Sequence, residues 1–343
     1  MTNIDIKFFP LKELNEYKFN SGEIYVKTMS LEEGGFSKVL KAVKKSEKDL
    51  IDSKQFIIKI NRKFTFQKAT NQSDNAEVVM SKEINFMDLR EISLLKGLNH
   101  PNIMRLIEVK ICRNTGDIWQ LMEYYPTDLH KFIMKIFKDE IKIDEEQLKN
   151  ICRSILEGVK YLHSKSIVHR DLKPGNIMYD PVSKALKIGD FGLSRKLEYK
   201  RCRKYSNVGT YPYKPPEVVM GYRNYSTEFD IWSLGCIFAE ICIGTPLFGT
   251  EEHSILPNQE EIFGTIDEKK VGIPNLNYPN HSIKKEGIGI KGHFSKFKLK
   301  FKFKDEKFFD LLEKMLDLCP ERRIKAEACL NHPWFSSKIS KNN

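Results

Sequence analysis

The residues best suited to chemistry lie in the segment VHRDLKPGN at 168–176. It holds a carboxylate, Asp171, a lysine, Lys173, and an amide, Asn176, and a second carboxylate follows in the Asp-Phe-Gly at 190–192. A carboxylate can accept a proton from a hydroxyl, and a lysine can neutralise a phosphate. Carboxylate and amide oxygens are ligands of hard cations such as Mg2+. Transfer of a phosphoryl group is a reaction that needs residues of these types.

The two motifs resemble the signature of protein kinases, in which a catalytic loop with an Asp and an Asn precedes an Asp-Phe-Gly. The resemblance implies that Asp171 orients the substrate hydroxyl and accepts its proton, and that Lys173 reaches the γ-phosphate of ATP. It also implies that Asn176 and Asp190 hold Mg2+. A solvated polar loop followed by a turn is the alternative interpretation, and the length of the match argues against it.

A second candidate pair precedes these motifs. Lys59 ends the apolar run Phe-Ile-Ile at 56–58, where the family places the lysine that binds the α- and β-phosphates. Glu91, on a predicted helix, resembles the glutamate that pairs with this lysine. Taken alone, a lysine at this position is more often the solvated end of a strand, and Glu91 is what favours the catalytic interpretation.

The segment LEEGGFSKV at 31–39 aligns with the glycine-rich loop of the family, but Gly34 is its one glycine at a motif position. Glu32 replaces the first glycine and Ser37 the third. Glycines there let backbone amides approach phosphate oxygens without a Cβ. A carboxylate at position 32 therefore predicts weaker ATP binding. An ordinary hairpin turn is the alternative interpretation of this segment.

Segments 90–96, 98–103 and 230–240 resemble those of cyclin-dependent kinases, serine/threonine kinases of the CMGC group. The similarity runs from about Ile24 to Phe335. It implies Met122 as the gatekeeper beside adenine. The predicted ATP-binding residues are Leu31, Gly34, Gly35, Val39, Lys59, Met122, Glu123, Tyr125 and Asp128.

Other positions follow from the same resemblance. Thr210 is expected to contact Asp171 and Lys173, and Glu217 to form a buried ion pair with Arg323. Lys214 replaces an arginine that supports preference for proline after the phosphorylated residue, so proline direction is left open. Phe36 replaces the tyrosine of an inhibitory Thr-Tyr pair, so that brake is expected to be absent.

A phosphate-binding cluster is also implied. Arg90, Arg170 and Arg195 match three arginines that grip an activating phosphate through guanidinium forks. Separate solvated arginines are the alternative. The family's acceptor threonine is replaced by Tyr205, with Ser206 beside it, and we favour Ser206 as the phosphorylated residue.

The elements that must position these residues are predicted from periodicity. Strands are expected at 24–44, 56–60, 103–111 and 117–123, and helices at 87–98, 128–137, 144–164, 227–242 and 306–318. Much of the polar stretch between residues 61 and 85 is predicted to be a mobile insertion. The predicted fold is α+β, the bilobal protein kinase fold, with a small β-rich N-lobe carrying one regulatory helix and a larger, mainly helical C-lobe. Its predicted parts are an N-terminal extension (1–23), a kinase domain (24–335) with N-lobe 24–122, hinge 123–128 and C-lobe 129–335, and a C-terminal tail (336–343).

The composition limits which class of protein and which cellular compartment are expected. Of 343 residues, 41% are hydrophobic and 30% charged, and 57 Lys and Arg against 46 Asp and Glu give a net charge of +11. The seven cysteines are scattered, odd in number and never spaced C-x-x-C, which argues against a disulfide framework or zinc site. The N-terminus does not read as a signal peptide, and the apolar stretch 231–248 is too interrupted to cross a membrane. An intracellular protein, cytoplasmic or nuclear or both, is therefore expected.

The expected cofactors are ATP and Mg2+, and the expected partners are a protein substrate and a cyclin-type regulatory subunit docking at Leu89. No membrane partner is expected. The stripe KFKLKFKFK at 296–304 alternates lysines with apolar residues. Such a stripe could suit nucleic-acid binding, but a half-buried extended segment with a basic edge is the favoured interpretation, so nucleic acid is not expected as a partner. A pseudokinase or scaffold with weakened ATP binding is the alternative function.

Overall fold

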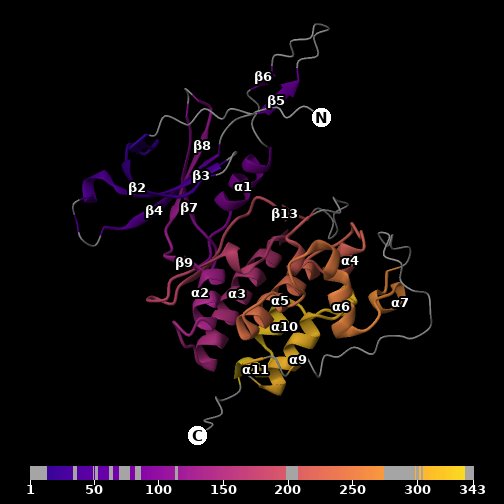
Figure 1. The fold of residues 1–343 in the computed structure, drawn as a ribbon. Coiled ribbons are helices and arrows are strands. Elements are labelled where there is room, and N and C mark those ends of the chain that lie inside the picture. Colours follow the sequence, from indigo (N-terminus) through magenta and orange to yellow (C-terminus); the bar gives the residue numbers. More distant parts are fainter. Residues whose placement is uncertain are drawn as a thin grey trace. The chain divides into compact units, whose positions relative to one another are not determined.

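The computed structural model describes residues 14–33, 37–48, 50, 53–61, 65–68, 78–81, 86–112, 115–197, 208–273, 298, 301–302 and 304–336. These residues form two compact units (Figure 1). Unit 1 holds the described residues up to 99 together with 104–124. Unit 2 holds residues 100–103 and those from 125 onward.

Unit 1 is built on a six-stranded antiparallel sheet with the order β1-β2-β3-β4-β8-β7. Its strands are rich in β-branched and aromatic residues, which suit a pleated, half-buried surface. Its elements are β1 (Glu16–Lys18), β2 (Ile24–Glu33), β3 (Ser37–Lys44), a 3-10 turn (Lys45–Glu47), β4 (Gln55–Asn61), β5 (Thr65–Lys68), β6 (Val78–Ser81), α1 (Phe86–Lys96), β7 (Leu106–Ile111) and β8 (Ile118–Glu123).

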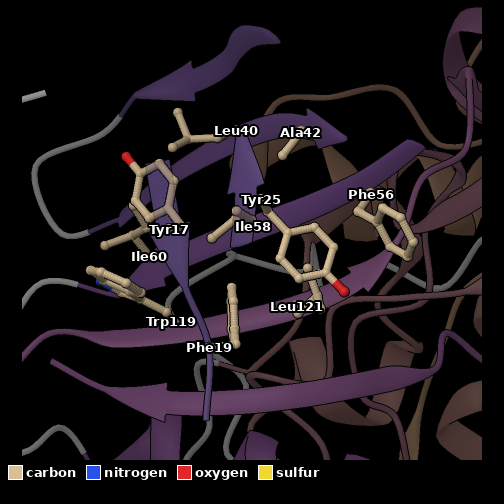
Figure 2. Packing of buried hydrophobic residues seen from close by; sticks show 10 residues of the cluster. All are labelled: Tyr17, Phe19, Tyr25, Leu40, Ala42, Phe56, Ile58, Ile60, Trp119 and Leu121. Carbon is tan, nitrogen blue, oxygen red and sulfur yellow. The ribbon is translucent and has the colours of Figure 1, made fainter. Parts of the chain in front are cut away.

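One face of this sheet carries an aromatic core. Figure 2 shows its ten buried residues, among them Tyr17, Phe19 and Trp119. The rings of Tyr17 and Trp119 meet edge to face, with centroids 5.0 Å apart. Because side chains alternate along a strand, burying Ile58 and Ile60 here directs Lys59 and Asn61 to the opposite face.

Two features of unit 1 differ from the sequence-based expectation. The sheet begins before residue 24, because β1 pairs with β2 and its Tyr17 covers Trp119. Within the stretch predicted to be a mobile insertion, β5 and β6 pair as a separate antiparallel hairpin. Short runs such as Val78-Val79-Met80 have high β propensity despite their polar surroundings, which explains this difference.

Unit 2 is mainly helical, with two small antiparallel pairings of strands. β11 lies between β12 and β9, and β10 pairs with β13. Its strands are β9 (Thr127–Asp128), β10 (Ile167–Val168), β11 (Ile177–Tyr179), β12 (Leu186–Ile188) and β13 (Arg195–Lys196). Its α-helices are α2 (Leu129–Phe137), α3 (Glu145–Ser164), α4 (Pro216–Val219), α5 (Glu228–Ile243), α6 (Ile255–Phe263), α7 (Glu268–Val271), α9 (Glu306–Met315), α10 (Ala326–Leu330) and α11 (Pro333–Ser336). Short 3-10 turns lie at Pro174–Asn176, Tyr211–Tyr213, Glu252–Ser254 and Pro320–Arg322.

Helix α5 is the centre of unit 2, since every residue from Phe229 to Cys242 is buried. Gly244 ends it in a left-handed conformation, with φ of 83°. Phe301, from the basic stripe, is also buried and packs against Phe308 and Phe309, in line with the half-buried interpretation of that segment. None of the helices described here is both long and apolar enough to span a membrane.

A buried ion pair ties α4 to the turn at Pro320–Arg322. Arg323 donates from both terminal nitrogens to the two carboxylate oxygens of Glu217, each at 2.6 Å. Both side chains are fully buried. The pair expected from the sequence is therefore present, and its two parallel hydrogen bonds fix the geometry of the chain around Glu217.

We predict that Arg323→Ala destabilises unit 2 strongly, because it leaves the Glu217 carboxylate buried and uncompensated. Removing one partner of a buried pair typically costs about 3–5 kcal/mol, which corresponds to a fall in Tm of roughly 6–20 °C for a unit of this size. The matched control is Arg322→Ala, which removes an exposed ion pair with Asp317. Thermal unfolding followed by circular dichroism should separate the two variants, and equal melting temperatures would contradict the prediction.

Candidate active site

Unit 1 contributes an ion pair between β4 and α1. The ammonium of Lys59 lies 2.9 Å from both carboxylate oxygens of Glu91. Glu91 is almost completely buried, whereas about a fifth of the Lys59 side chain is exposed. The pairing predicted from the sequence is present. It holds the ammonium of Lys59 in a fixed position.

Charged residues lie where β2 ends and where β3 begins. Glu32 is exposed and pairs in register with Val39, while Glu33 forms an ion pair of 3.1 Å with the nearly buried Lys38. Leu31 is also exposed on β2. The predicted phosphate-binding glycines at 34 and 35, together with Phe36, lie outside the described residues.

The remaining predicted nucleotide-binding residues divide between the units. Met122 and Glu123 lie at the end of β8 in unit 1, and Tyr125 belongs to unit 2. Asp128 caps helix α2 by accepting a hydrogen bond of 2.8 Å from the backbone of Lys131. Asp128 therefore already has a structural role, which sequence reasoning did not identify.

Unit 2 gathers three predicted residues around the Asp171 carboxylate. The Thr210 hydroxyl donates to Oδ1 at 2.6 Å, and the Lys173 ammonium lies 3.0 Å from Oδ2. The Asn176 amide donates to Oδ2 at 3.1 Å and to the Asp171 carbonyl at 2.8 Å. Lys173 also donates to Thr210 at 3.1 Å. The contacts expected of Thr210 are both present.

This arrangement determines the charge on Asp171. Burial by itself raises the pKa of the carboxyl group, but the hydrogen bond from Thr210 and the positive charge of Lys173 outweigh burial. The pKa of Asp171 therefore lies below its ordinary value. The group is an ionised carboxylate at neutral pH, with its orientation fixed from several sides.

Gly209 allows Thr210 to reach this carboxylate. It adopts a left-handed conformation, with φ of 82°, and a Cβ added there would lie 2.7 Å from the Arg170 carbonyl oxygen. Any other residue would be strained and would displace the backbone. The close approach of these two chain segments thus requires a glycine.

The catalytic loop is held by a carboxylate that sequence reasoning did not assign. Asp230 of α5 is fully buried and accepts hydrogen bonds of 2.9 Å from the backbone amides of His169 and Arg170. His163 of α3 lies 2.9 Å from the same carboxylate. The available signal was a carboxylate within an otherwise apolar helix, since such a group needs buried donors.

Asp190 and Asn176 are the predicted metal ligands. Asp190 is exposed and has a left-handed backbone, with φ of 54°, an unusual conformation that often marks functional sites. The amide of Asn176 points its nitrogen toward Asp171, which leaves its oxygen for another partner. Carboxylate and amide oxygens fit Mg2+, which commonly takes one or two protein carboxylates and completes its shell with phosphates and water. Among the described residues, no three His, Cys, Asp or Glu side chains form a metal cluster.

The three arginines of the predicted cluster are divided between the two units. Arg170 is buried and donates to the Leu193 carbonyl and the Tyr225 hydroxyl, at 2.7 and 3.1 Å. Arg195 lies on β13 in unit 2, and Arg90 is exposed on α1 in unit 1. Both candidate phosphorylation sites, Tyr205 and Ser206, lie outside the described residues. The cluster stays a prediction.

Known proteins similar to this chain are protein kinases. A model of the protein kinase domain matches residues 25–335. Cyclin-dependent kinase G-1 of Oryza sativa subsp. indica is 38% identical over 259 residues, covering 72% of this chain and 36% of the relative. Cyclin-dependent kinase B2-1 of Oryza sativa subsp. japonica is 35% identical over 258 residues, covering 72% of this chain and 76% of the relative.

A solved structure of the yeast RNA Pol II CTD kinase CTDK-1 complex covers 96% of this chain and 98% of that chain, with a TM-score of 0.74 and 25% identity. The predicted α+β kinase fold is confirmed. The chain spans only about a third of the length of the G-1 relative but three quarters of that of B2-1.

We predict that Glu32→Gly tightens ATP binding about threefold, because it removes a like charge from the expected path of the phosphates, an effect of the size typical for exposed charge pairs. A fluorescence titration with nucleotide measures the change. The matched control is Glu23→Gly, which removes an exposed carboxylate elsewhere in unit 1. The prediction is wrong if Glu32→Gly binds ATP with the affinity of the unaltered protein.

Proposed function

The chain belongs to the protein kinase family, in its cyclin-dependent kinase-like branch, and from this premise we propose that it transfers the γ-phosphoryl group of ATP to serine and threonine hydroxyls of proteins. The observation that carries the proposal is the Asp171 carboxylate, ionised and held by Thr210, Lys173 and Asn176. A carboxylate fixed in this way can orient an attacking hydroxyl and accept its proton.

Two lysines supply positive charge for the phosphates. Lys59, held by Glu91, would contact the α- and β-phosphates, and the pairing would keep its ammonium in place between turnovers. Lys173 lies beside Asp171 and would neutralise charge on the transferred group. Positioning and charge stabilisation of this kind account for most of the catalysis of phosphoryl transfer.

Asn176 and Asp190 would hold Mg2+ through their side-chain oxygens. When bound, the ion supplies positive charge that neutralises the phosphate oxygens as the bond to the leaving group breaks. The hydrogen bonds from Asn176 to Asp171 would tie the metal ligand to the proton acceptor. A change in one group would therefore disturb the other.

A pseudokinase is the second candidate, and the observation that favours it is the carboxylate of Glu32 where the family has a glycine. Against it stand the ion pair of Lys59 with Glu91 and the complete set of contacts around Asp171. A binding module would not need an ionised carboxylate fixed by three side chains. We therefore favour activity.

A protein substrate and a cyclin-type regulatory subunit are part of the proposal. Leu89 is partly exposed on α1, with 39% of its surface accessible, and would offer an apolar contact to such a subunit. An intracellular setting, cytoplasmic or nuclear, is proposed from the cysteines, since those in the described part of the chain are all unpaired. Lys214, which stands where the family has an arginine, is buried, and its ammonium lies 3.7 Å from the centre of the Tyr211 ring.

The test is transfer of label from γ-labelled ATP, with Mg2+, to a generic basic protein. We expect Asp171→Asn to lower the rate at least about a hundredfold, the usual effect of losing a positioned proton acceptor. Asp180→Asn is the matched control, because Asp180 bonds only within an exposed turn of unit 2. The label should appear on serine and threonine. Equal rates for Asp171→Asn and the unaltered protein would establish the pseudokinase instead.

A further inference from the structure

A buried cation follows the threonine that contacts Asp171. Lys214 comes four residues after Thr210, and it is only 2% exposed. Its ammonium lies 3.7 Å from the centre of the Tyr211 ring. An ammonium is strongly hydrated in water, so covering it costs free energy, which the face of an aromatic ring partly offsets. An aliphatic side chain would fill this position at lower cost, so the covered charge needs a further explanation.

The ring that covers this ammonium is itself held in place. The Tyr211 hydroxyl donates a hydrogen bond to the carboxylate of Glu252, an exposed residue that begins the 3-10 turn at Glu252–Ser254. Burial and this carboxylate raise the pKa of Tyr211 to about 12, so the hydroxyl keeps its proton at neutral pH. Tyr211 therefore connects a covered cation, Lys214, to an exposed anion, Glu252.

The backbone of residues 211–214 is fixed to two helices. Ser233 of α5 donates from its hydroxyl to the Tyr213 carbonyl at 2.8 Å. Gln259 of α6 donates from its side-chain amide to the Lys214 carbonyl at 3.0 Å. Both donors are almost completely buried. A segment anchored in this way presents its side chains at fixed positions, as a specificity site requires.

The place of Tyr211 in the chain brings it close to the substrate. Its neighbour Thr210 donates a hydrogen bond of 2.6 Å to Asp171, and consecutive Cα atoms are about 3.8 Å apart. The substrate hydroxyl must reach Asp171, and Lys214 stands where the family recognises the residue after the phosphorylated one. That substrate residue would meet an aromatic ring and the exposed carboxylate of Glu252, while the ammonium of Lys214 is covered.

We propose that Tyr211 determines which residue can follow the phosphorylated serine or threonine. Its ring keeps the Lys214 ammonium from the substrate, and the ring and the Glu252 carboxylate together bind a basic side chain in preference to an acidic one. Arginine suits this surface, since a guanidinium can stack on an aromatic ring and pair with a carboxylate. The inference rests on the proposed function and deepens it, because it names the substrate class: proteins with a basic residue after the acceptor.

Packing is the competing explanation of the same contacts. If the ring of Tyr211 only fills space over Lys214, removing it lowers the stability of unit 2 and the rate toward every substrate by the same factor. If the ring selects the substrate, removing it changes the ratio of rates between substrates of opposite charge, since complementary charges act chiefly on specificity. The ratio therefore separates the two explanations.

The test measures kcat/KM for peptides that differ only in the residue after a single serine, which is arginine, glutamate or proline. The unaltered protein should favour the arginine peptide over the glutamate peptide about tenfold. Tyr211→Ala should reduce this preference to about twofold or less, because the uncovered ammonium attracts glutamate. Tyr211→Phe keeps the ring and should retain most of the preference. Glu252→Gln should lower it about threefold, the effect of one exposed charge.

Each ratio comes from one preparation, so a loss of folded protein cancels. The matched control is Glu251→Gln, which removes the neighbouring exposed carboxylate and leaves the bond from Tyr211 to Glu252 intact. It should change the preference by no more than about twofold. The proposal is overturned if the unaltered protein does not favour arginine over glutamate, if it favours the proline peptide over the arginine peptide, or if Tyr211→Ala leaves the preference unchanged.

Failure of the proposed function would give a different result. In that case no peptide receives label in a way that Asp171→Asn abolishes. The affinities of the fluorescent arginine and glutamate peptides, measured by anisotropy, still test the inference, because the same order of preference and the same response to Tyr211→Ala are expected for their Kd values. Equal Kd values for the two peptides would then overturn the role of Tyr211.

Discussion

The catalytic part of unit 2 is arranged so that it offsets the desolvation of the Asp171 carboxylate. A buried carboxylate tends to take up a proton and would then be useless as a proton acceptor. The hydrogen bond from Thr210 and the charge of Lys173 reverse that tendency. They can do so only because Gly209 lets the two chain segments approach each other and because Asp230 holds the backbone of the catalytic loop through hydrogen bonds.

Unit 1 holds a cation, the ammonium of Lys59, in place in a comparable way. Lys59 projects from a sheet whose opposite face is filled by aromatic rings, so its position is set by the register of β4. Glu91 holds the ammonium through both of its carboxylate oxygens. In both units the useful charge is kept in place by groups that themselves take no part in the transfer.

Much of this could be predicted from the sequence, because the catalytic residues lie in short motifs and the long helices show strong apolar periodicity. Helix α3 and the contacts of Thr210 are examples. Groups that act across long sequence distances could not be predicted in the same way. The support that Asp230 gives to the catalytic loop and the capping role of Asp128 depend on how the chain folds around them. Strand β1 was missed because three residues carry little periodic signal.

The central claim is that Lys59 and Lys173 each contact the phosphates of bound ATP. An acyl-phosphate derivative of ATP, which acylates lysines beside the phosphate chain, tests this directly when the modified peptides are identified by mass spectrometry. The account predicts that both lysines are acylated and that excess ATP with Mg2+ protects both, whereas Lys184, on an exposed turn, reacts at a rate that ATP does not alter. Protection of only one of the two lysines, or of neither, would contradict it.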